Sequence, residues 1–295
     1  MSIIATHSGG FHADDVFAVA ALKLHLQHTE ETAAEVVRTR NPEQIESCDY
    51  AIDVGGVYDP AAGRFDHHQA EGAGQRENGI PYAAFGLIWK EFGVELCEDE
   101  KIAEMIDKRL VQAIDAPDNG VSLTGEGEFE DAYPYYLASA VSVFNRTWKE
   151  PAEREDEAFA EMVEWATALL HREIEVAAHR LEGEKLVEEA YEQAADKRVI
   201  YMDQDLPWQG VLAKKEEPLF VVYPKDSGRW RLRAVPAEGN FESRAELPEA
   251  WRGKHDAELQ QVTGVDTAIF CHKSLPMIVA EDKAGIDRLV ELSLA

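Results

Sequence analysis

The hydrophobic and polar residues of the first 70 positions alternate between strand-like and helix-like patterns. Apolar runs of strand length occur at 3–6, 35–39 and 50–54, and an amphipathic helix is expected from about Asp14 to His28. Strand, helix and strand in this order are typical of a βαβ unit with parallel strands. The N-terminal part therefore predicts an α/β domain built on a parallel sheet.

Helical patterns dominate the middle of the chain. We expect helices at 82–92 and 100–114, the second because its apolar residues recur near the helical period. A nearly continuous helical stretch is expected over 135–191, and the charged run at 153–157 indicates an exposed turn or a helix start within it.

The pattern changes after Asp196 to short strand-like runs at 198–202, 219–223, 230–235 and 267–272, followed by a helix over 281–294. Proline and glycine turns separate several of these runs. We therefore predict two domains. Residues 1–195 form a parallel-sheet domain with a helical middle, and residues 196–295 form a smaller α+β domain.

The formal net charge of −28 argues against a protein that coats nucleic acid non-specifically. Residues 1–195 carry 15 Lys+Arg against 40 Asp+Glu, whereas residues 196–295 carry 14 against 17. The second domain is therefore the better candidate for binding an anionic substrate. The three cysteines have no metal-type spacing, and buried free thiols are expected. No apolar run reaches membrane-spanning length and no signal segment is evident, which predicts a cytoplasmic protein.

Histidines and aspartates follow the predicted strands of the N-terminal domain. The candidates are His7, His12, Asp14, Asp53, Asp66, His67 and His68. Each alone is more often a structural residue than a ligand. In an open parallel sheet, however, these positions converge at the carboxyl ends of the strands, where ligands bind. Imidazole and carboxylate together favour a transition metal, and we expect Mn²⁺, with Fe²⁺, Zn²⁺ or Co²⁺ as alternatives.

Four ordered blocks resemble one known family. They are THSGGFHADD at 6–15, AIDVGG at 51–56, RFDHHQ at 64–69 and IDAPDNG at 114–120. Together they resemble the DHH phosphoesterase superfamily, and more narrowly its melanocyte-proliferating-gene (MYG) exonuclease branch. The resemblance covers the whole chain and continues less sharply in RAELPEAWRG at 244–253 and FCHKS at 270–274.

The resemblance implies a site with two divalent ions, Mn²⁺ or alternatively Mg²⁺ or Co²⁺. Asp53 would bridge the ions, His7 and His12 would hold one, and Asp14, His67 and Asp118 would hold the other. His68 would face the phosphate, while Asp66 would orient the histidine pair or act as an occasional direct ligand. Asp15 is expected to stabilise the start of its helix and to point away from the ligands.

The first block departs from the pattern of the superfamily, and the ligand in the fourth block is open. Most members of the superfamily resemble His-x₃-Asp-x-Asp in the first block, whereas this chain has His7-x₄-His12-x-Asp14. The affinity of the first ion is therefore in question. Either Asp115 or Asp118 is the ligand of the fourth block. We favour Asp118 because the Asn-Gly that follows permits a tight turn.

The resemblance implies a 3′→5′ exonuclease that hydrolyses short single-stranded RNA or DNA by in-line attack of hydroxide. In the second domain, Arg229, Arg231 and Arg233 alternate along a predicted strand and so share one face. We expect Arg231, Arg244, Arg252 and His272 to bind substrate phosphates, although a solvated polar face is an equal alternative for the strand. Trp208, Trp230 and Trp251 are expected to pack in a core more often than to stack on bases.

Two other functions compete with the exonuclease. One is a small-substrate phosphatase or phosphodiesterase acting on pyrophosphate or a cyclic dinucleotide, for which the acidic surface is no handicap. The other is a metal- or nucleotide-binding protein without turnover. The sequence leaves the oligomeric state open, a homo-oligomer included.

Overall fold

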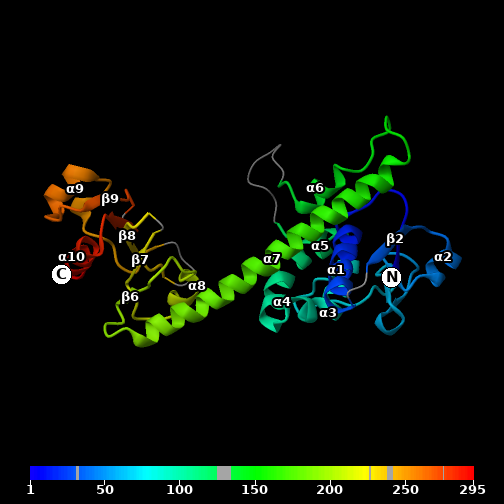
Figure 1. Ribbon diagram of the computed structural model, residues 1–295, viewed down its shortest axis with the longest axis horizontal. Coiled ribbons are helices and arrows are strands. Elements are labelled where there is room, and N and C mark those ends of the chain that lie inside the picture. Colours follow the sequence, from blue (N-terminus) through cyan, green and yellow to red (C-terminus); the bar gives the residue numbers. More distant parts are fainter. Residues whose placement is uncertain (31–32, 125–133, 226, 238–241, 275) are drawn as a thin grey trace. The chain divides into compact units, whose positions relative to one another are not determined.

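The computed structural model describes residues 1–30, 33–124, 134–225, 227–237, 242–274 and 276–295 (Figure 1). Two units make up the chain, Met1–Ala178 and His179–Ala295. The long helix α7 (Arg154–Gln193) begins in the first unit and ends in the second. Near its end, Val187 and Tyr191 pack into a core of the second unit. The predicted domain boundary at residue 195 lies just after this helix.

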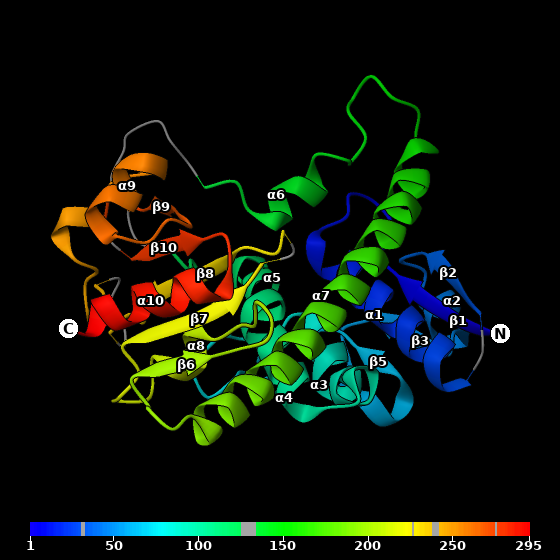
Figure 2. The same ribbon diagram turned by 60° about the vertical axis from the view of Figure 1, so that its left-hand side comes forward.

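The first unit contains a mixed sheet whose order, within the described residues, is β2-β1-β3-β5-β4 (Figure 2). The strands are β1 (Ser2–Thr6), β2 (Ala34–Arg38), β3 (Tyr50–Ile52), β4 (Tyr58–Asp59) and β5 (Arg64–Phe65). β1 runs parallel to both β2 and β3, and β3 runs parallel to β5. Only β4, among the described strands of this sheet, is antiparallel to its neighbour. The predicted parallel arrangement of the first strands is confirmed.

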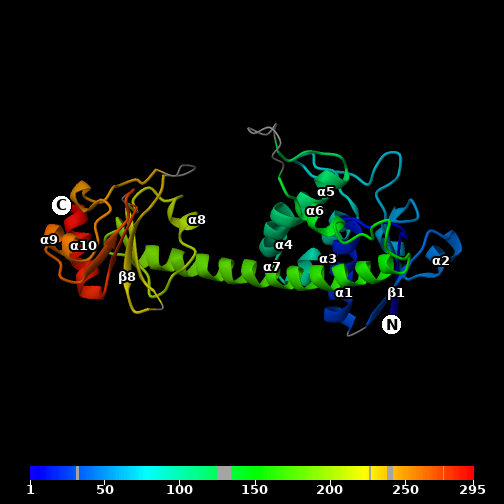
Figure 3. The same cartoon turned by 90° about the horizontal axis from the view of Figure 1, so that it is seen from above.

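The sheet of the first unit is accompanied by helices. They are α1 (Ala13–Glu30), α2 (Pro42–Ser47), α3 (Ala84–Cys97), α4 (Glu100–Ile106), α5 (Gln112–Asp118) and α6 (Leu137–Ser142), with a 3₁₀ turn at Pro60–Ala62. Every side chain from Ala13 to Leu22 is buried, because α1 packs against β1, β3 and α3 (Figure 3). This central helix fixes the loop between β1 and α1.

Two helical predictions for the middle of the chain need correction. The helix expected over 100–114 is interrupted by a π-helical segment, Asp107–Val111, between α4 and α5. The stretch expected to be nearly all helix over 135–191 contains non-helical turns from Val143 to Glu153. The helix start predicted at 153–157 is confirmed, since α7 begins at Arg154.

The second unit contains a sheet in the order β6-β7-β8-β10-β9 among the described residues (Figure 2). Its strands are β6 (Val199–Tyr201), β7 (Phe220–Pro224), β8 (Trp230–Ala234), β9 (Ala268–Cys271) and β10 (Met277–Ala280). Its helical segments are α8 (Gln209–Leu212), η3 (Glu249–Trp251), α9 (Asp256–Thr263) and α10 (Lys283–Leu294). The predictions missed α8, α9 and β10, which are short or carry few apolar residues.

Two composition-based expectations can be compared with the structure. Cys48, Cys97 and Cys271 are free and buried, as expected. Among the described residues, no helix combines the length and the apolar character needed to cross a bilayer.

Candidate metal centre

The candidate site lies where three parallel strands of the first unit end. His7 follows β1, Asp53 follows β3, and Asp66, His67 and His68 follow β5. Parallel strands place their carboxyl ends at one edge of a sheet, so these residues meet there. Two helices complete the site: Asp14 lies in the first turn of α1, and Asp118 is the last residue of α5.

The Asp53 carboxylate lies between two imidazoles. Its Oδ2 atom is 3.4 Å from Nε2 of His7, and its Oδ1 atom is 3.3 Å from Nε2 of His67. Asp53 also has a backbone φ of 55°, a left-handed conformation that is uncommon outside glycine. Such strain is frequent at functional sites. The backbone bend thus accompanies a carboxylate that faces both histidines.

Three overlapping groups of side chains each bring their ligand atoms within 4.8 Å of one another. The groups are His7, His12 and Asp53; Asp53, His67 and His68; and Asp14, His67 and Asp118. Asp53 and His67 each belong to two groups. The structure therefore brings together seven of the eight sequence-predicted residues in these groups, from segments far apart in the chain.

Two buried atoms at the centre have no hydrogen-bond partner among the described residues, Oδ1 of Asp53 and Nε2 of His67. They lie 3.3 Å from each other, and Nε2 of His67 also lies 3.2 Å from Oδ2 of Asp118, but neither contact has hydrogen-bond geometry. Buried polar atoms are usually paired, and an unpaired one calls for an explanation such as an ion. Since both atoms are good ligands for a divalent transition metal, the residues present fit a metal centre.

Hydrogen bonds hold two of the carboxylates in place. Asp14 accepts from the backbone N–H groups of Ala84 and Phe85, at 2.9 and 2.7 Å, where α3 begins. Helix N-termini favour negative charge in this way. Asp66 accepts from Gly56 N at 2.6 Å, and from His68 through both its backbone N–H and Nδ1. Asp66 belongs to none of the three groups, and it orients His68.

The carboxylates strongly change the protonation of the buried histidines. Burial alone would lower the pKa of His7, but Asp15 and Asp53 outweigh it and raise that pKa to about 10. Burial would also lower the pKa of His67, but the carboxylates of Asp118 and Asp53 outweigh it and raise that pKa to about 11. Burial would raise the pKa of Asp53, but His67 and His7 hold it well below its usual value. Without a bound cation, the centre therefore keeps protons on its imidazoles.

Asp115 and Asp118 have different surroundings. Asp115 is fully buried and binds the guanidinium of Arg76 at 2.8 Å and the backbone N–H of Gly86 at 3.0 Å. Burial raises the pKa of Asp115 to about 7, against the opposing effect of Arg76. Asp118 instead places Oδ2 3.2 Å from Nε2 of His67. Of the two candidates, only Asp118 lies in a metal-type group within the described residues.

Comparison with known proteins places the chain in a family. A family model described as "Uncharacterised protein family (UPF0160)", the MYG1 exonuclease model, matches residues 3–294. The chain belongs to the MYG1 exonuclease family. The MYG1 exonuclease of Homo sapiens is 35% identical over 303 residues, which cover 92% of this chain and 80% of the human protein. The MYG1 protein of Chlamydia pneumoniae is 30% identical over 302 residues, covering 99% of this chain and 96% of that protein.

Two residues of this MYG1-family chain adjoin the centre and were not among the predicted site residues. Asp15 accepts from His12 N at 2.8 Å and so supports the start of α1, as expected. Its other oxygen, however, lies 3.1 Å from Nε2 of His7 rather than pointing away. A cavity of about 460 Å³ lies at the metal centre, and Arg40 is part of its lining. Arg40 follows β2, another parallel strand, so its position could have suggested it.

The predicted substrate-binding residues of the second unit have varied partners. Arg252 binds the Glu249 carboxylate, at 2.7 Å from each of two nitrogens, and the carbonyl of Lys273. Arg244 donates to the carbonyls of Ala213, Lys215 and Pro218. Nδ1 of His272 accepts from Ser274 N at 3.1 Å. Arg231 lies on β8, and its Nε atom is buried without a hydrogen-bond partner among the described residues.

The aromatic residues of the second unit lie mainly in its cores. Trp208 and Trp251 are buried, which agrees with core packing rather than base stacking. Trp230 is half-buried, and it packs against the core that contains Trp251.

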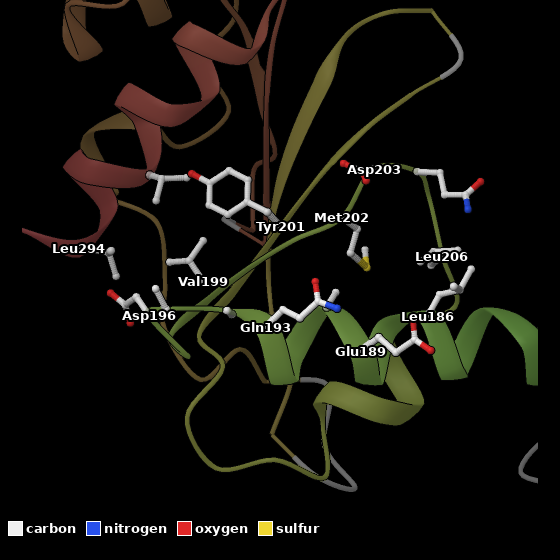
Figure 4. Close-up of a pocket in the computed structure, with 15 residues that line it drawn as sticks. Leu186, Glu189, Gln193, Asp196, Val199, Tyr201, Met202, Asp203, Leu206 and Leu294 are labelled. Carbon is white, nitrogen blue, oxygen red and sulfur yellow. The ribbon is translucent and has the colours of Figure 1, made fainter.

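A larger cavity of about 620 Å³ lies in the second unit, between the end of α7, β6 and α10 (Figure 4). Its lining includes three carboxylates, Glu189, Asp196 and Asp203, but no lysine or arginine. A phosphate would be repelled by such a lining. The smaller cavity at the metal centre also has three carboxylates, but Arg40 and three histidines line it as well, which makes it the better candidate for phosphate chemistry.

Proposed function

We propose that this chain is a metal-dependent phosphodiesterase of the DHH type that degrades short single-stranded RNA or DNA from one end. The observation that carries the proposal is the pair of unpartnered buried atoms, Oδ1 of Asp53 and Nε2 of His67, at the meeting point of three ligand groups. The exonuclease name of the human relative supports a nucleic-acid substrate.

The residues divide naturally between two neighbouring cation positions. His7, His12 and Asp53 would hold one divalent ion, and Asp14, His67 and Asp118, with Asp53 shared, would hold the other. Mn²⁺ suits this mixture of imidazole and carboxylate. When bound, such ions supply Lewis acidity that activates water and neutralises phosphate charge. Asp14 is held against the start of α3, which limits the positions that its carboxylate can take.

His68 is placed to contact the phosphate. Its side chain is 63% exposed, and Asp66 fixes the ring by accepting from Nδ1 at 2.8 Å. Because Nδ1 faces Asp66, Nε2 is the ring nitrogen left to face a substrate oxygen. A protonated Nε2 would donate a hydrogen bond where negative charge accumulates during attack. Asp66 acts here as a positioning residue.

The second unit is proposed to add substrate contacts through Arg231, Arg244, Arg252 and His272. Arg231 is the strongest of the four, because its guanidinium group has no hydrogen-bond or ion-pair partner in the described part of the chain. The guanidinium groups of Arg244 and Arg252 already bind protein oxygens, so their contribution to substrate binding requires exchange of those contacts.

The decisive experiment is metal-dependent turnover of defined substrates. Protein freed of metal with a chelator is incubated with Mn²⁺ and a 5-mer RNA, a 5-mer DNA, pyrophosphate or a cyclic dinucleotide. We expect stepwise release of mononucleotides from a 5-mer, none without added metal, and loss of release in Asp53→Asn. Cleavage of pyrophosphate or the cyclic dinucleotide alone would replace the exonuclease with a small-substrate enzyme. Absence of turnover on all four substrates would contradict the proposal.

A further inference from the structure

Arg40 lines both the metal-centre cavity and a second, more apolar cavity. It lines the first cavity together with His7, Asp53 and His68. It also lines an adjoining cavity of about 520 Å³, and the two cavities share Arg40, Val54 and Gly55. The side chain therefore borders both cavities.

The position of Arg40 is tied directly to a candidate metal ligand. Its Nε atom donates to the carbonyl oxygen of Ser8 at 3.1 Å. The same oxygen lies 3.4 Å from Nδ1 of His7. Because one carbonyl contacts both side chains, the guanidinium is held at a fixed place beside the centre.

The terminal nitrogens of Arg40 have no hydrogen-bond or ion-pair partner among the described residues, and the side chain is exposed. This is unusual in a chain with 57 acidic residues. The other described arginines of the first unit are engaged: Arg38, Arg76, Arg109, Arg146, Arg154 and Arg172 with carboxylates, and Arg64 with backbone carbonyls. A fixed guanidinium with two vacant donor groups is suited to a phosphate.

The adjoining cavity has the character of a nucleoside site. Its lining includes the apolar side chains of Pro42, Ile45, Val54 and Val57, and beside them the charged side chains of Glu46 and Arg64. Val57 is 48% exposed, so an apolar surface is available to a ligand there. Nucleotide sites commonly combine a largely apolar wall with a few polar groups that fix orientation.

We propose that Arg40 and this adjoining cavity form a subsite for the nucleotide next to the one whose phosphodiester is cleaved. Arg40 binds the neighbouring phosphate, and the apolar wall contacts the sugar and base attached to it. The inference rests on the proposed phosphodiesterase function, and it assigns that site a preference for at least two linked nucleotides over an isolated phosphate ester.

Equilibrium binding tests the subsite without depending on turnover. The ligands are the dinucleotide pApA with a phosphorothioate linkage, which slows hydrolysis, and 5′-AMP, which has a single phosphate. Isothermal titration in Mn²⁺ should show that Arg40→Gln weakens dinucleotide binding about tenfold, equivalent to about 1.4 kcal/mol, and weakens 5′-AMP binding much less. Arg40→Lys should retain part of the affinity, because it keeps the charge but loses the planar donor fork.

Two further variants separate the subsite from general effects. Val57→Asp places a carboxylate on the apolar wall and should weaken the dinucleotide selectively. Arg172→Gln removes the same charge from an exposed position that lines neither cavity, and it should leave both affinities unchanged. Equal weakening of both ligands in Arg40→Gln, or no weakening, would overturn the proposal.

The outcome also distinguishes the subsite from the proposed function. If the wild type binds the dinucleotide but hydrolyses no pApA with an ordinary linkage, the phosphodiesterase function fails while the Arg40 comparison is still decisive. If the wild type does not bind the dinucleotide, the subsite is contradicted. For active protein, Arg40→Gln should reduce kcat/KM for pApA about tenfold more than for bis(p-nitrophenyl) phosphate, which lacks the neighbouring nucleotide.

Discussion

Oδ2 of Asp118 lies 3.2 Å from Nε2 of His67, although one residue ends helix α5 and the other follows strand β5. This contact links the helical part of the first unit to the edge of its sheet. It also closes the third ligand group, which Asp14 completes. The centre therefore depends on the packing of α1, α3 and α5 as much as on the strands.

We expect Asp53→Asn to abolish tight metal binding, because Asp53 is the carboxylate shared by two of the ligand groups. The substitution replaces one ligand oxygen with an amide nitrogen, which does not bind cations. Activity on a 5-mer RNA should fall at least about 100-fold. Bound Mn²⁺ is measured by elemental analysis after gel filtration. Asp59→Asn, on the exposed strand β4, is the matched control and should retain metal.

A second pair of substitutions separates ligand from structural carboxylate. Asp118→Ala should weaken Mn²⁺ binding at least about tenfold, whatever its effect on the unfolding free energy of the metal-free protein, because Asp118 belongs to a ligand group. Asp115→Ala should instead lower that free energy by about 3 kcal/mol, because it leaves Gly86 N and part of the Arg76 guanidinium unpaired in the interior.

Denaturant unfolding in chelator and Mn²⁺ titration measure the two effects independently. If Asp115→Ala lost metal without loss of stability while Asp118→Ala lost neither, the assignment of the two residues would have to be exchanged.

The sequence predicted which side chains converge at the edge of the sheet, because they follow strands whose β-pattern was clear. Asp53 and the Asp66–His68 triplet end short apolar runs, and parallel strands necessarily bring such positions to one edge. The roles of Asp14 and Asp15 were harder to separate, since adjacent helix residues differ by about 100° in direction and the first turns of α1 are buried on all sides. Only the structure shows that Asp15 contacts both His12 N and His7.

Two other features depended on tertiary packing that local patterns do not report. The π-helical segment at Asp107–Val111 places Asp107 beside Arg76, a residue 31 positions earlier in the chain. Arg40 follows the parallel strand β2, but a single arginine after a strand does not by itself indicate a site. Arg40 is distinctive only because every other described arginine of the first unit binds a carboxylate or backbone carbonyls through the terminal nitrogens of its guanidinium group.

Gly86 should tolerate no side chain. A Cβ atom at this position would lie 1.8 Å from Oδ2 of Asp115 and 3.0 Å from Arg76, so the buried ion pair would have to shift. We expect Gly86→Ala to lower the free energy of unfolding by about 2 kcal/mol. Gly210→Ala is the control, because its nearest neighbour would be 3.6 Å away and alanine favours the helix. Equal stability of the two variants in urea would contradict the close packing around Asp115.

Metal uptake should release protons. The pKa values of His7 and His67 in the metal-free protein are raised to about 10 and about 11, so both imidazoles are protonated at pH 8. A cation can bind their nitrogens only after the protons leave, which makes apparent Mn²⁺ affinity rise with pH until those values are reached. Titration calorimetry at pH 8 in two buffers of different ionisation enthalpy should therefore report release approaching one proton per histidine engaged.

The same shifts fix how the stability of the metal-free protein depends on pH. Both folded-state pKa values lie above the unfolded value of 6.5. Between pH 6.5 and these values, the folded protein therefore binds more protons than the unfolded protein. The stabilisation from these histidines is fully present below pH 6.5 and is lost as the pH rises through about 10 to 11. In His67→Gln this alkaline loss should shrink, whereas His28→Gln, at a half-exposed position on α1, should keep it. Metal uptake without proton release, together with an unchanged alkaline profile in His67→Gln, would mean that the imidazoles are neutral in the metal-free centre.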